Sequence, residues 1–522
     1  MKIKVIAAML ISATMLISVC SCQGGGENKA DTSPESGSGG HDTAQTSISD
    51  NSDSLKNTSG QDSVADAEHE AVKCTNDNNY VISESNGELY YRCNYNLLYH
   101  IIDDINVELV TNNSGMESEY KDVSDPVLSK SFTGLDYSAA VGDNCFFSLQ
   151  DGDNNSENYC CIRRFDLENG KIVKSTDLFD RKKLLEFYKK ESSDQNTEEN
   201  NYMSLEPYFQ IVNLTYGNDG FVYFINLGNT YDYKIRPADI NNYRIGRFAE
   251  DGSSIEYIGK ENACAMEVYN GYIYYYDNGY KLKVTNGKPE KDYDYSRRGI
   301  YRMKTDGSEK EKLCSLKTEE SDSVYKCTHF MRIIDGYIYF LSADNIISLS
   351  RIPINGGEPE KITDIFFGQN MVFSYCVDSD AQKVYFQDTF NGEIAVNKSD
   401  IGKDKPEVMI KKLACRDYFY QGFADKAGNY LYLNCWKNDN ISMKMNKKLI
   451  TDGEFTPDHE NENCLIRPMP SRRYDLNTGK YEKIYEVLTF ESKVRADEFL
   501  NSVDYSTVGK TTFEWRETDL EY

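Results

Sequence analysis

The 522-residue sequence predicts an all-β protein, a β-propeller of seven four-stranded blades with short helical insertions. Three observations lead to this fold class. A tight turn followed by a short aromatic strand recurs along the chain, as in "DGYIYF" from Asp335. Hairpins with Asp-Gly or Asn-Gly turns follow these strands. The aromatic strands are also apolar on both faces, as expected for sheets that are covered on both sides.

The aromatic strand occurs seven times, at intervals of 46 to 77 residues between its central aromatic residues. The shortest intervals match the roughly 40 to 50 residues of a four-stranded propeller blade, and the longer ones correspond to the same unit with insertions. The central aromatic residues are Tyr90, Phe146, Tyr223, Tyr274, Tyr339, Tyr385 and Tyr432.

A hairpin with polar ends follows most of the aromatic strands. Asp-Gly and Asn-Gly turns favour hairpins because both central residues adopt positive φ. Each repeat is therefore predicted to be a meander of one strand, the aromatic strand and the two hairpin strands. The hairpins begin at Ile162, Tyr243, Ile300, Ser350 and Arg472, the last after a polar insertion from about Lys437 to Glu462.

The tyrosines of the aromatic strands are interpreted as packing residues. In "YIYYY" from Tyr272 both faces are apolar, and the inner strands of a blade are covered by a neighbouring blade on each side. Tyrosine fills the wide gap between twisted sheets while its hydroxyl group reaches a partner or water. A tyrosine-lined platform for carbohydrate is the alternative for four loop tyrosines, namely Tyr231, Tyr233, Tyr293 and Tyr295.

Two segments with helical periodicity interrupt the β pattern. The segment 180–191 has Asp180 as a candidate N-cap and places Leu184, Leu185 and Tyr188 on one face, so it predicts a short helix between the second and third units. "ESKVRADEFLNSV" from Glu491 has a similar spacing. We expect both helices to be decorations of the propeller.

Closing a propeller usually requires one chain terminus to contribute a strand to the blade of the other. The candidates for this closing strand are "TVGKTTFEWRETD" near the end of the chain and "EAVKCT" from Glu70.

Residues 1–22 have the features of a secretion signal that ends in a lipid-attachment site. Basic "MKIK" leads into an apolar stretch at residues 5–19, too short for a membrane span but typical of a signal-peptide h-region. The next residues resemble the lipobox of bacterial lipoproteins, with the small Ser21 before Cys22. Cys22 is the predicted lipidation site. Cys20 is the rival, although it would place a valine where a small residue is expected, and a plain cleaved signal is the other alternative.

Residues 23–79 are predicted to be a flexible linker, and residues 80–522 the propeller domain. The linker is rich in Ser, Gly and Asp and contains no aromatic residue. Such a segment cannot bury enough apolar surface to offset the entropy of ordering it.

The charge of the chain argues against nucleic acid as a partner. With 58 Lys and Arg against 84 Asp and Glu, the net charge is −26. Binding to nucleic acid requires clustered basic residues that neutralise phosphates. We interpret the acidity as that of a solvated exterior.

The runs "DGYIYF…ISLSRIPINGGEPEKIT" and "NGYIYYY…GIYRMKTDGSEKEKL" resemble a bacterial surface-lipoprotein domain of unknown function. That domain is related to the YWTD propeller of the low-density-lipoprotein-receptor-related proteins. The likeness is clearest from about Ala263 to Asp364 and fades in the first two units and the last. The receptor motif Tyr-Trp-Thr-Asp is here "YIYF" or "YIYY". The resemblance implies a β-propeller and an extracellular location, and it implies neither an activity nor a ligand.

Local motifs predict no catalytic site, no metal site and no cofactor. HExxH, CxxC, GxSxG and P-loop motifs do not occur in the body of the sequence, and His100, His329 and His459 are isolated from one another. "DGDNNSEN" from Asp151 has EF-hand-like offsets but lacks the turn glycine and the bidentate Glu, so a solvated loop is favoured over a calcium site.

The 14 cysteines include 12 beyond Cys20 and Cys22. An even number in an exported protein is compatible with disulfides. Several of these cysteines lie in strand-like runs, where cysteine behaves as a small hydrophobic residue, so buried free thiols are an equal alternative.

These features predict a monomeric, lipid-anchored protein on the outer face of the bacterial cytoplasmic membrane. The leading hypothesis is a binding or scaffold module for a peptide, a glycan or an envelope protein, docked on the face that carries the variable loops. The alternative is a carbohydrate-active enzyme, a glycosidase or lyase whose carboxylates come from several blades. A passive structural or sensor-associated component is the third hypothesis.

Overall fold

The computed structural model describes most of the chain between residues 82 and 518, and these residues belong to one compact unit. Residues 1–81, with both candidate lipidation cysteines and the candidate strand from Glu70, lie outside the described residues. The described residues are 82–92, 97–111, 139–150, 161–191, 211–226, 243–277, 279–285, 288–316, 331–343, 347–365, 375–380, 382–390, 393–401, 407–410, 420–437 and 455–518.

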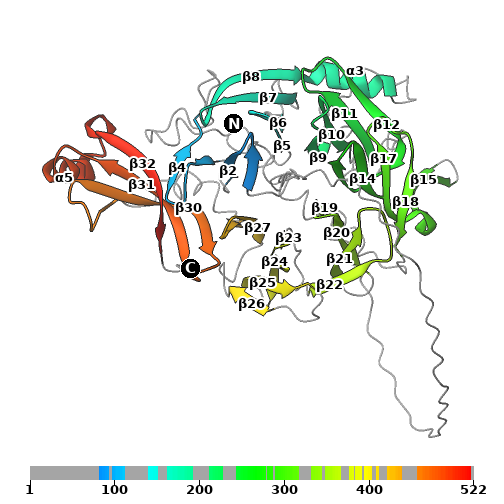
Figure 1. Cartoon of the computed structure of the whole chain (residues 1–522). Coiled ribbons are helices and arrows are strands. Elements are labelled where there is room, and N and C mark those ends of the chain that lie inside the picture. Colours follow the sequence, from blue (N-terminus) through cyan, green and yellow to red (C-terminus); the bar gives the residue numbers. More distant parts are fainter. Residues whose placement is uncertain are drawn as a thin grey trace, which may run out of the picture. The chain divides into compact units, whose positions relative to one another are not determined.

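The strands form seven four-stranded antiparallel units in chain order, called blades 1 to 7 below (Figure 1). The protein is therefore a β-propeller, and each blade is the predicted meander. Blades 1 to 3 are β1 (Ile82–Ser85), β2 (Glu88–Arg92), β3 (Leu98–Ile101), β4 (Asn106–Leu109); β5 (Ala139–Gly142), β6 (Cys145–Gln150), β7 (Cys161–Glu168), β8 (Lys171–Phe179); and β9 (Ile211–Tyr216), β10 (Phe221–Asn226), β11 (Arg244–Ala249), β12 (Ile255–Asn262).

Blade 4 contains an additional hairpin, β15 (Tyr280–Thr285) and β16 (Lys288–Tyr293), between its second and third strands. Blades 4 to 7 are β13 (Ala265–Tyr269), β14 (Tyr272–Asp277), β17 (Gly299–Lys304), β18 (Glu311–Ser315); β19 (Met331–Ile334), β20 (Tyr337–Ala343), β21 (Ile347–Pro353), β22 (Glu360–Ile365); β23 (Tyr375–Asp378), β24 (Lys383–Phe390), β25 (Glu393–Asp400), β26 (Glu407–Ile410); and β27 (Tyr420–Ala427), β28 (Tyr430–Lys437), β30 (Cys464–Asp475), β31 (Tyr481–Thr489).

Buried hydrophobic clusters lie at every seam between consecutive blades, including the seam between blades 7 and 1. In addition, β1 contacts both β5 and β27, so the blades close on themselves. All seven predicted central aromatic residues are buried. The prediction that tyrosine serves as packing material in these strands is confirmed.

A row of three cross-strand partners recurs in blades 3 to 7. The central tyrosine lies opposite a basic residue of the third strand, which in turn pairs with a glutamate of the fourth strand. In blades 3 to 6 the acidic partner is exposed, so each of these ion pairs contributes at most about 1 kcal/mol. The rows are Tyr223–Arg247–Glu256, Tyr274–Arg302–Glu311, Tyr339–Arg351–Glu360, Tyr385–Lys398–Glu407 and Tyr432–Arg473–Glu482.

The antiparallel meander separates two kinds of connection. The turns after the first and third strands of a blade lie at one end of the strands, and they are short, such as Asn86-Gly87 and the β30–β31 turn. Connections after the second and fourth strands lie at the other end, and their lengths vary from a short link, as between β24 and β25, to long segments, as between β10 and β11. We call the first end the tight-turn end. Many of the longer connections fall outside the described residues.

The strand that links the first and last blades comes from the C-terminal stretch, one of the two candidates from the sequence. Blade 7 takes all four of its strands from one continuous stretch of chain, so β32 (Lys510–Glu517) does not replace a strand of that blade. Instead β32 pairs with β31 and also with β4 of blade 1. It joins the outermost strands of the first and last blades into one large sheet.

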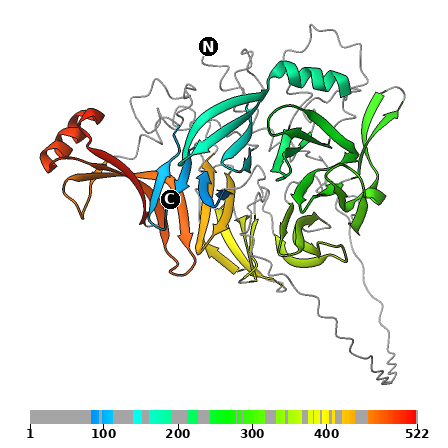
Figure 2. The ribbon, with the colours of Figure 1, turned by 45° about the horizontal axis from the view of Figure 1, so that its top comes forward.

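A C-terminal arm extends from blade 7 (Figure 2). It consists of residues 455–470 and 485–513, with β29 (Thr456–Pro457) and the helix α5 (Lys493–Ser502). The sequence placed the blade 7 hairpin at Arg472, but β30 already begins at Cys464. The arm has its own apolar cluster, in which Phe499 of α5 packs against Phe455 and Phe490.

The two predicted helices are present. α3 (Arg181–Glu191) lies between blades 2 and 3, and the Asp180 carboxylate accepts a hydrogen bond from the Lys183 N–H group at 2.8 Å, as an N-cap does. Leu184 is buried as expected, together with Phe187, which the sequence pattern did not single out. In the described part of the chain, no helix has the length and apolarity to cross a membrane.

Candidate functional site

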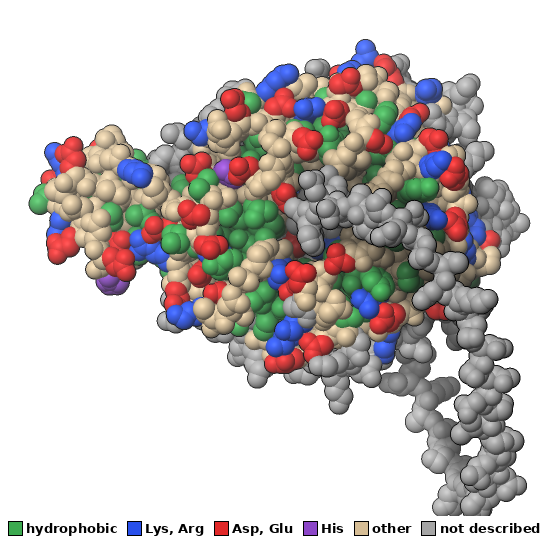
Figure 3. All heavy atoms as spheres, in the orientation of Figure 1, with side chains coloured by type: hydrophobic (Ala, Val, Ile, Leu, Met, Phe, Trp, Pro, Cys, Tyr) green, Lys and Arg blue, Asp and Glu red, His purple; other side chains and the backbone are tan. Residues whose placement is uncertain are grey.

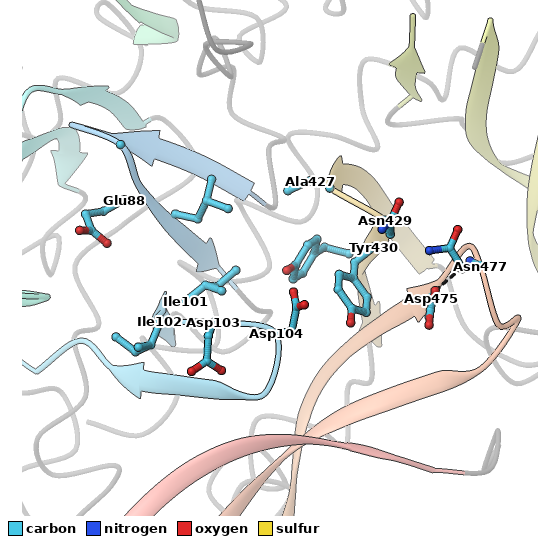
Figure 4. A pocket seen from close by; sticks show the side chains of 14 residues that line it. Glu88, Ile101, Ile102, Asp103, Asp104, Ala427, Asn429, Tyr430, Asp475 and Asn477 are labelled. Carbon is cyan, nitrogen blue, oxygen red and sulfur yellow. Dashed lines mark hydrogen bonds between the residues drawn. The ribbon is translucent and has the colours of Figure 1, made fainter. Parts of the chain in front are cut away.

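A pocket of about 560 Å³ lies at the tight-turn end of the seam between blades 1 and 7 (Figure 4). Four turns or turn-flanking segments surround it, two from each blade. Its lining residues are Gly87, Glu88, Leu89, Ile101, Ile102, Asp103, Asp104, Ala427, Gly428, Asn429, Tyr430, Tyr432, Asp475 and Asn477.

Local backbone conformation shapes the two β1–β2 and β27–β28 turns. Asn86 and Gly87 have φ values of 52° and 82°, and Gly428 has a φ of 55°. A Cβ atom added at Gly87 or Gly428 would meet no atom within 4 Å, so these glycines are required for backbone conformation and not for space. The backbone of these two turns therefore borders the pocket and leaves its interior open.

The β3–β4 turn, "IDDI" from Ile102 to Ile105, forms one wall. The Asp103 carboxylate accepts hydrogen bonds from the Asn106 side chain and from the N–H groups of Asn106 and Ile105, which lower the pKa of Asp103. The turn is thus held by its own aspartate. Ile102 and Ile105 are 48% and 58% exposed. Isoleucine is uncommon in tight turns, where Gly, Pro, Asn, Asp and Ser predominate.

The β30–β31 turn on the opposite side is fixed in a similar way. The Asp475 carboxylate accepts hydrogen bonds from the Thr478 hydroxyl at 2.8 Å and from the Asn477 N–H group at 2.8 Å. Partial burial opposes ionisation, but these hydrogen bonds outweigh it and lower the pKa of Asp475. Asp103 and Asp475 therefore keep their negative charge at neutral pH.

Glu88 is positioned by a buried histidine. The His100 Nε2 atom and the Glu88 carboxylate are 2.7 Å apart, and the His100 ring stacks on Tyr90 at 5.1 Å. On its other side His100 meets the β7–β8 turn of blade 2, where a Cβ atom at Gly170 would lie 2.7 Å from Nδ1. Burial, with a contribution from the Glu88 charge, raises the pKa of Tyr90 to about 12. Three neighbouring elements thus hold Glu88 at the pocket rim.

Tyr430 and Tyr432 provide the aromatic wall of the pocket, and Arg473 lies behind them. The Arg473 guanidinium is 3.6 Å from the centre of the Tyr430 ring and 4.4 Å from that of Trp515. It also pairs with Glu482 and donates a hydrogen bond to the Asp104 carbonyl. Burial raises the pKa of both tyrosines, so their hydroxyl groups stay protonated at neutral pH.

The charge lining the pocket is of one sign. Four carboxylates, from Glu88, Asp103, Asp104 and Asp475, line it together with no lysine or arginine. In Figure 4 the Asp104 side chain points toward Tyr430. Figure 3 shows hydrophobic side chains gathered near the place where β2, β27 and β30 meet in Figure 1, with acidic side chains around them.

Most of the candidate residues from the sequence analysis do not line this pocket. His100 lies beside the pocket, whereas His459 is exposed on the arm. Tyr295 is 45% exposed, but the Arg298 guanidinium covers its ring at 4.2 Å. Tyr293 is the last residue of β16. The other tyrosines of the proposed platform, together with His329, Asp151 and the residues after it, lie outside the described residues.

No group of three or more His, Cys, Asp or Glu side chains is arranged to hold a metal ion within the described ranges. Six cysteines are buried and form no disulfide within the described part of the chain: Cys145, Cys161, Cys264, Cys314, Cys376 and Cys464. For these six, the free-thiol interpretation agrees with the structure.

Several solved structures are similar to the chain in fold. A chain of a nidogen/laminin complex is 13% identical, with 65% of this chain and 90% of that chain covered and a TM-score of 0.33. An oligogalacturonate lyase in complex with manganese is 14% identical, with 63% and 78% covered and a TM-score of 0.34. A putative TolB from Agrobacterium tumefaciens is 11% identical, with 58% and 88% covered and a TM-score of 0.28.

The similar structures are β-propellers that include both binding proteins and enzymes, so they leave the function undetermined. No protein family matches the sequence, and no curated protein matches it. The arguments about function below therefore depend on the pocket itself.

Proposed function

We propose that the protein is a lipid-anchored recognition module that binds a protein or peptide ligand in the pocket between blades 1 and 7. In this proposal Cys22 carries the lipid on the outer face of the bacterial cytoplasmic membrane, and residues 23–79 tether the propeller. The sequence features of residues 1–22 and the resemblance to surface-lipoprotein propellers support the anchoring part.

One observation supports the binding part most strongly: apolar side chains are exposed around a pocket that is built from otherwise polar turns. Ile102 and Ile105 project from the β3–β4 turn, and Leu89, Ala427 and Tyr430 continue the apolar surface. An apolar patch with a polar rim is typical of a recognition site. A volume of about 560 Å³ is also in the range of ligand pockets, roughly 300 to 1,000 Å³.

The location differs from the face expected from the sequence. The expected docking face was the one that carries the variable loops, whereas the proposed pocket lies among tight turns. Because short turns lose little entropy on binding, a site made from them is pre-organised. The proposal therefore assigns recognition to the tight-turn end.

Binding is tested with the full-length chain on an array of peptides and glycans. We expect Ile102→Asp to abolish the signals of the wild-type protein, because it places a charge on the apolar wall. Val408→Asp in β26 is the matched control, since Val408 is 47% exposed and belongs to blade 6, which does not line the pocket. Equal signals from wild type and Ile102→Asp would contradict the proposal.

The anchor is tested separately by substitution of each candidate cysteine. Cys22→Ala is expected to release the protein from the membrane fraction and to remove the mass of the diacylglyceryl group. Cys20→Ala is expected to leave both unchanged. The reverse result would assign the lipid to Cys20, and no lipid on either variant or the wild type would contradict anchoring.

A carbohydrate-active enzyme is the second candidate, because several carboxylates line the pocket, three from blade 1 and Asp475 from blade 7. Glu88, held by His100, and Asp104 are the carboxylates that a general acid–base reaction would use. Incubation with a panel of polysaccharides tests this function. New reducing ends or unsaturated products that disappear with Glu88→Gln would favour the enzyme over the binding module.

A further inference from the structure

We infer that the ligand is a peptide segment in which a lysine or arginine lies beside aliphatic residues. This inference deepens the proposed function and rests on it. It assigns the basic side chain to the pocket and the neighbouring aliphatic side chains to the surface formed by Ile102 and Ile105.

The first argument is charge complementarity. The lining contributes four carboxylates and no cationic side chain. Arg473, which lies behind the Tyr430 ring, is 1% exposed and is paired with Glu482. An anionic ligand would therefore be repelled, whereas an ammonium or guanidinium group would be attracted.

The second argument is the availability of a carboxylate. Asp103 and Asp475 are occupied by hydrogen bonds within their own turns, and Glu88 is bound to His100. Among the described residues none donates a hydrogen bond to the Asp104 carboxylate, which lies between the β3–β4 turn and Tyr430 (Figure 4). Asp104 is therefore the group best placed to pair with a bound cation.

The third argument is the apolar wall. Lysine and arginine bury their methylene stems on apolar surfaces while their charged ends reach polar groups. Leu89, Ile101 and Ala427 offer such a surface inside the pocket. Ile102 and Ile105 extend it outside, where a free amine would leave them uncovered but an adjoining aliphatic residue would not. This difference favours a peptide over a small amine.

Calorimetric titration of the full-length chain with three matched peptides tests the inference. The peptides are acetylated and amidated Gly-Leu-X-Leu-Gly, in which X is lysine, norleucine or glutamate. We expect the lysine peptide to bind at least about tenfold more tightly than the norleucine peptide and the glutamate peptide not to bind. Because the charges are exposed, we also expect about threefold weaker binding when salt rises from 50 to 300 mM.

Substitutions locate the binding. Asp104→Asn should lower the affinity for the lysine peptide about tenfold and leave the affinity for the norleucine peptide unchanged. Asp335→Asn is the matched control, because Asp335 is an exposed carboxylate in the β19–β20 turn, at the same end of blade 5. It should change neither affinity. Unchanged melting temperatures of both variants would verify that they are folded.

Three outcomes would overturn the inference: equal affinity for lysine and norleucine peptides, equal effects of Asp104→Asn and Asp335→Asn, or no binding of any of the three peptides. If the array in the preceding section still gives signals that Ile102→Asp removes, the recognition function stands and only the basic-peptide ligand fails. If those signals are also missing, both proposals fail.

Discussion

The hydroxyl group of Tyr91 in β2 accepts a hydrogen bond of 3.1 Å from the backbone N–H group of Arg472 in β30, 381 residues away in the chain. The same hydroxyl lies 3.0 Å from the carbonyl oxygen of Leu433 in β28. Tyr91 is fully buried. One side chain of blade 1 thus satisfies backbone groups of two strands of blade 7, directly behind the proposed binding pocket.

Tyr91→Phe is therefore expected to destabilise the protein by about 1–3 kcal/mol, because it leaves buried backbone groups without a partner. Urea unfolding measures the change. Tyr275→Phe is the matched control, since the Tyr275 hydroxyl is also buried but has no hydrogen-bond partner among the described residues. A loss of stability for Tyr275→Phe as large as that for Tyr91→Phe would show that the seam hydrogen bonds are not the cause.

The second prediction concerns Trp515 of β32, which packs in the seam between blades 1 and 7. Its ring packs against Tyr91 at 5.7 Å and Tyr432 at 5.9 Å and is 4% exposed. Trp515→Ala should cost about 3–5 kcal/mol, as expected for removal of a large buried aromatic side chain. Hydrogen exchange should increase in β4 and β31 and stay unchanged in β20. Uniform acceleration in all three strands would argue against a local role of β32 in closing the ring.

The buried carboxyl group of Asp425 in β27 should make the stability of the protein depend on pH. It is 3% exposed, and its nearest counter-charge is Arg332 of β19 at 3.5 Å, while Lys426 pairs with Asp378 at 3.3 Å. Burial raises the pKa of Asp425, although Arg332 and the N–H groups of Lys426 and Ile82 oppose the shift. Because the folded pKa exceeds the unfolded value, ionisation of Asp425 costs folding free energy above that value.

The stability of the wild-type protein relative to Asp425→Asn should therefore fall as pH rises from about 3.8, the ordinary carboxyl value, through the raised pKa of the folded state. Urea unfolding of both proteins between pH 4 and 7 tests this prediction. If the wild-type protein instead gained stability relative to the variant over this interval, attraction by Arg332 would outweigh burial.

The next prediction concerns the reactivity of the buried cysteine thiols. Burial raises the pKa of Cys145 to about 12 and also raises the pKa values of Cys314 and Cys376. Because the thiolate is the reactive form, these residues should not react with iodoacetamide in the native protein at pH 8. Mass spectrometry without reduction should find all three alkylated after unfolding. A mass that shows a disulfide at any of them would contradict the structure.

The repeat pattern of the sequence was sufficient for the blades because it depends on local chemistry. Turn residues with positive φ, such as Asn270 and Gly271, and the two-sided apolar strand that follows them determine a meander without knowledge of its neighbours. The same holds for the N-cap of α3 at Asp180. These features were predicted correctly.

The pocket could not be predicted in this way, because it exists only where the first and last repeats meet. Residues from 87 to 104 contribute one half and residues from 427 to 477 the other, so its formation depends on closure of the ring. These are also repeats in which the resemblance was weakest. The sequence did contain one usable signal, the pair of isoleucines around Asp103 and Asp104 in a hairpin turn.

The path of β32 was unpredictable for a related reason. A strand-forming C-terminal stretch was recognised, but its partner depends on which sheet edge is free. The outer edge of blade 1, at β4, and that of blade 7, at β31, lie close enough for one strand to pair with both. In this way β32 links the first and last blades.

The most direct test of the account is a crystal structure of the full-length chain with the lysine peptide of the titration. The account predicts the lysine ammonium group within about 4 Å of the Asp104 carboxylate, with the flanking leucines on Ile102 and Ile105. Peptide density at the opposite end of the strands, or on the C-terminal arm, with an empty pocket between blades 1 and 7 would contradict it.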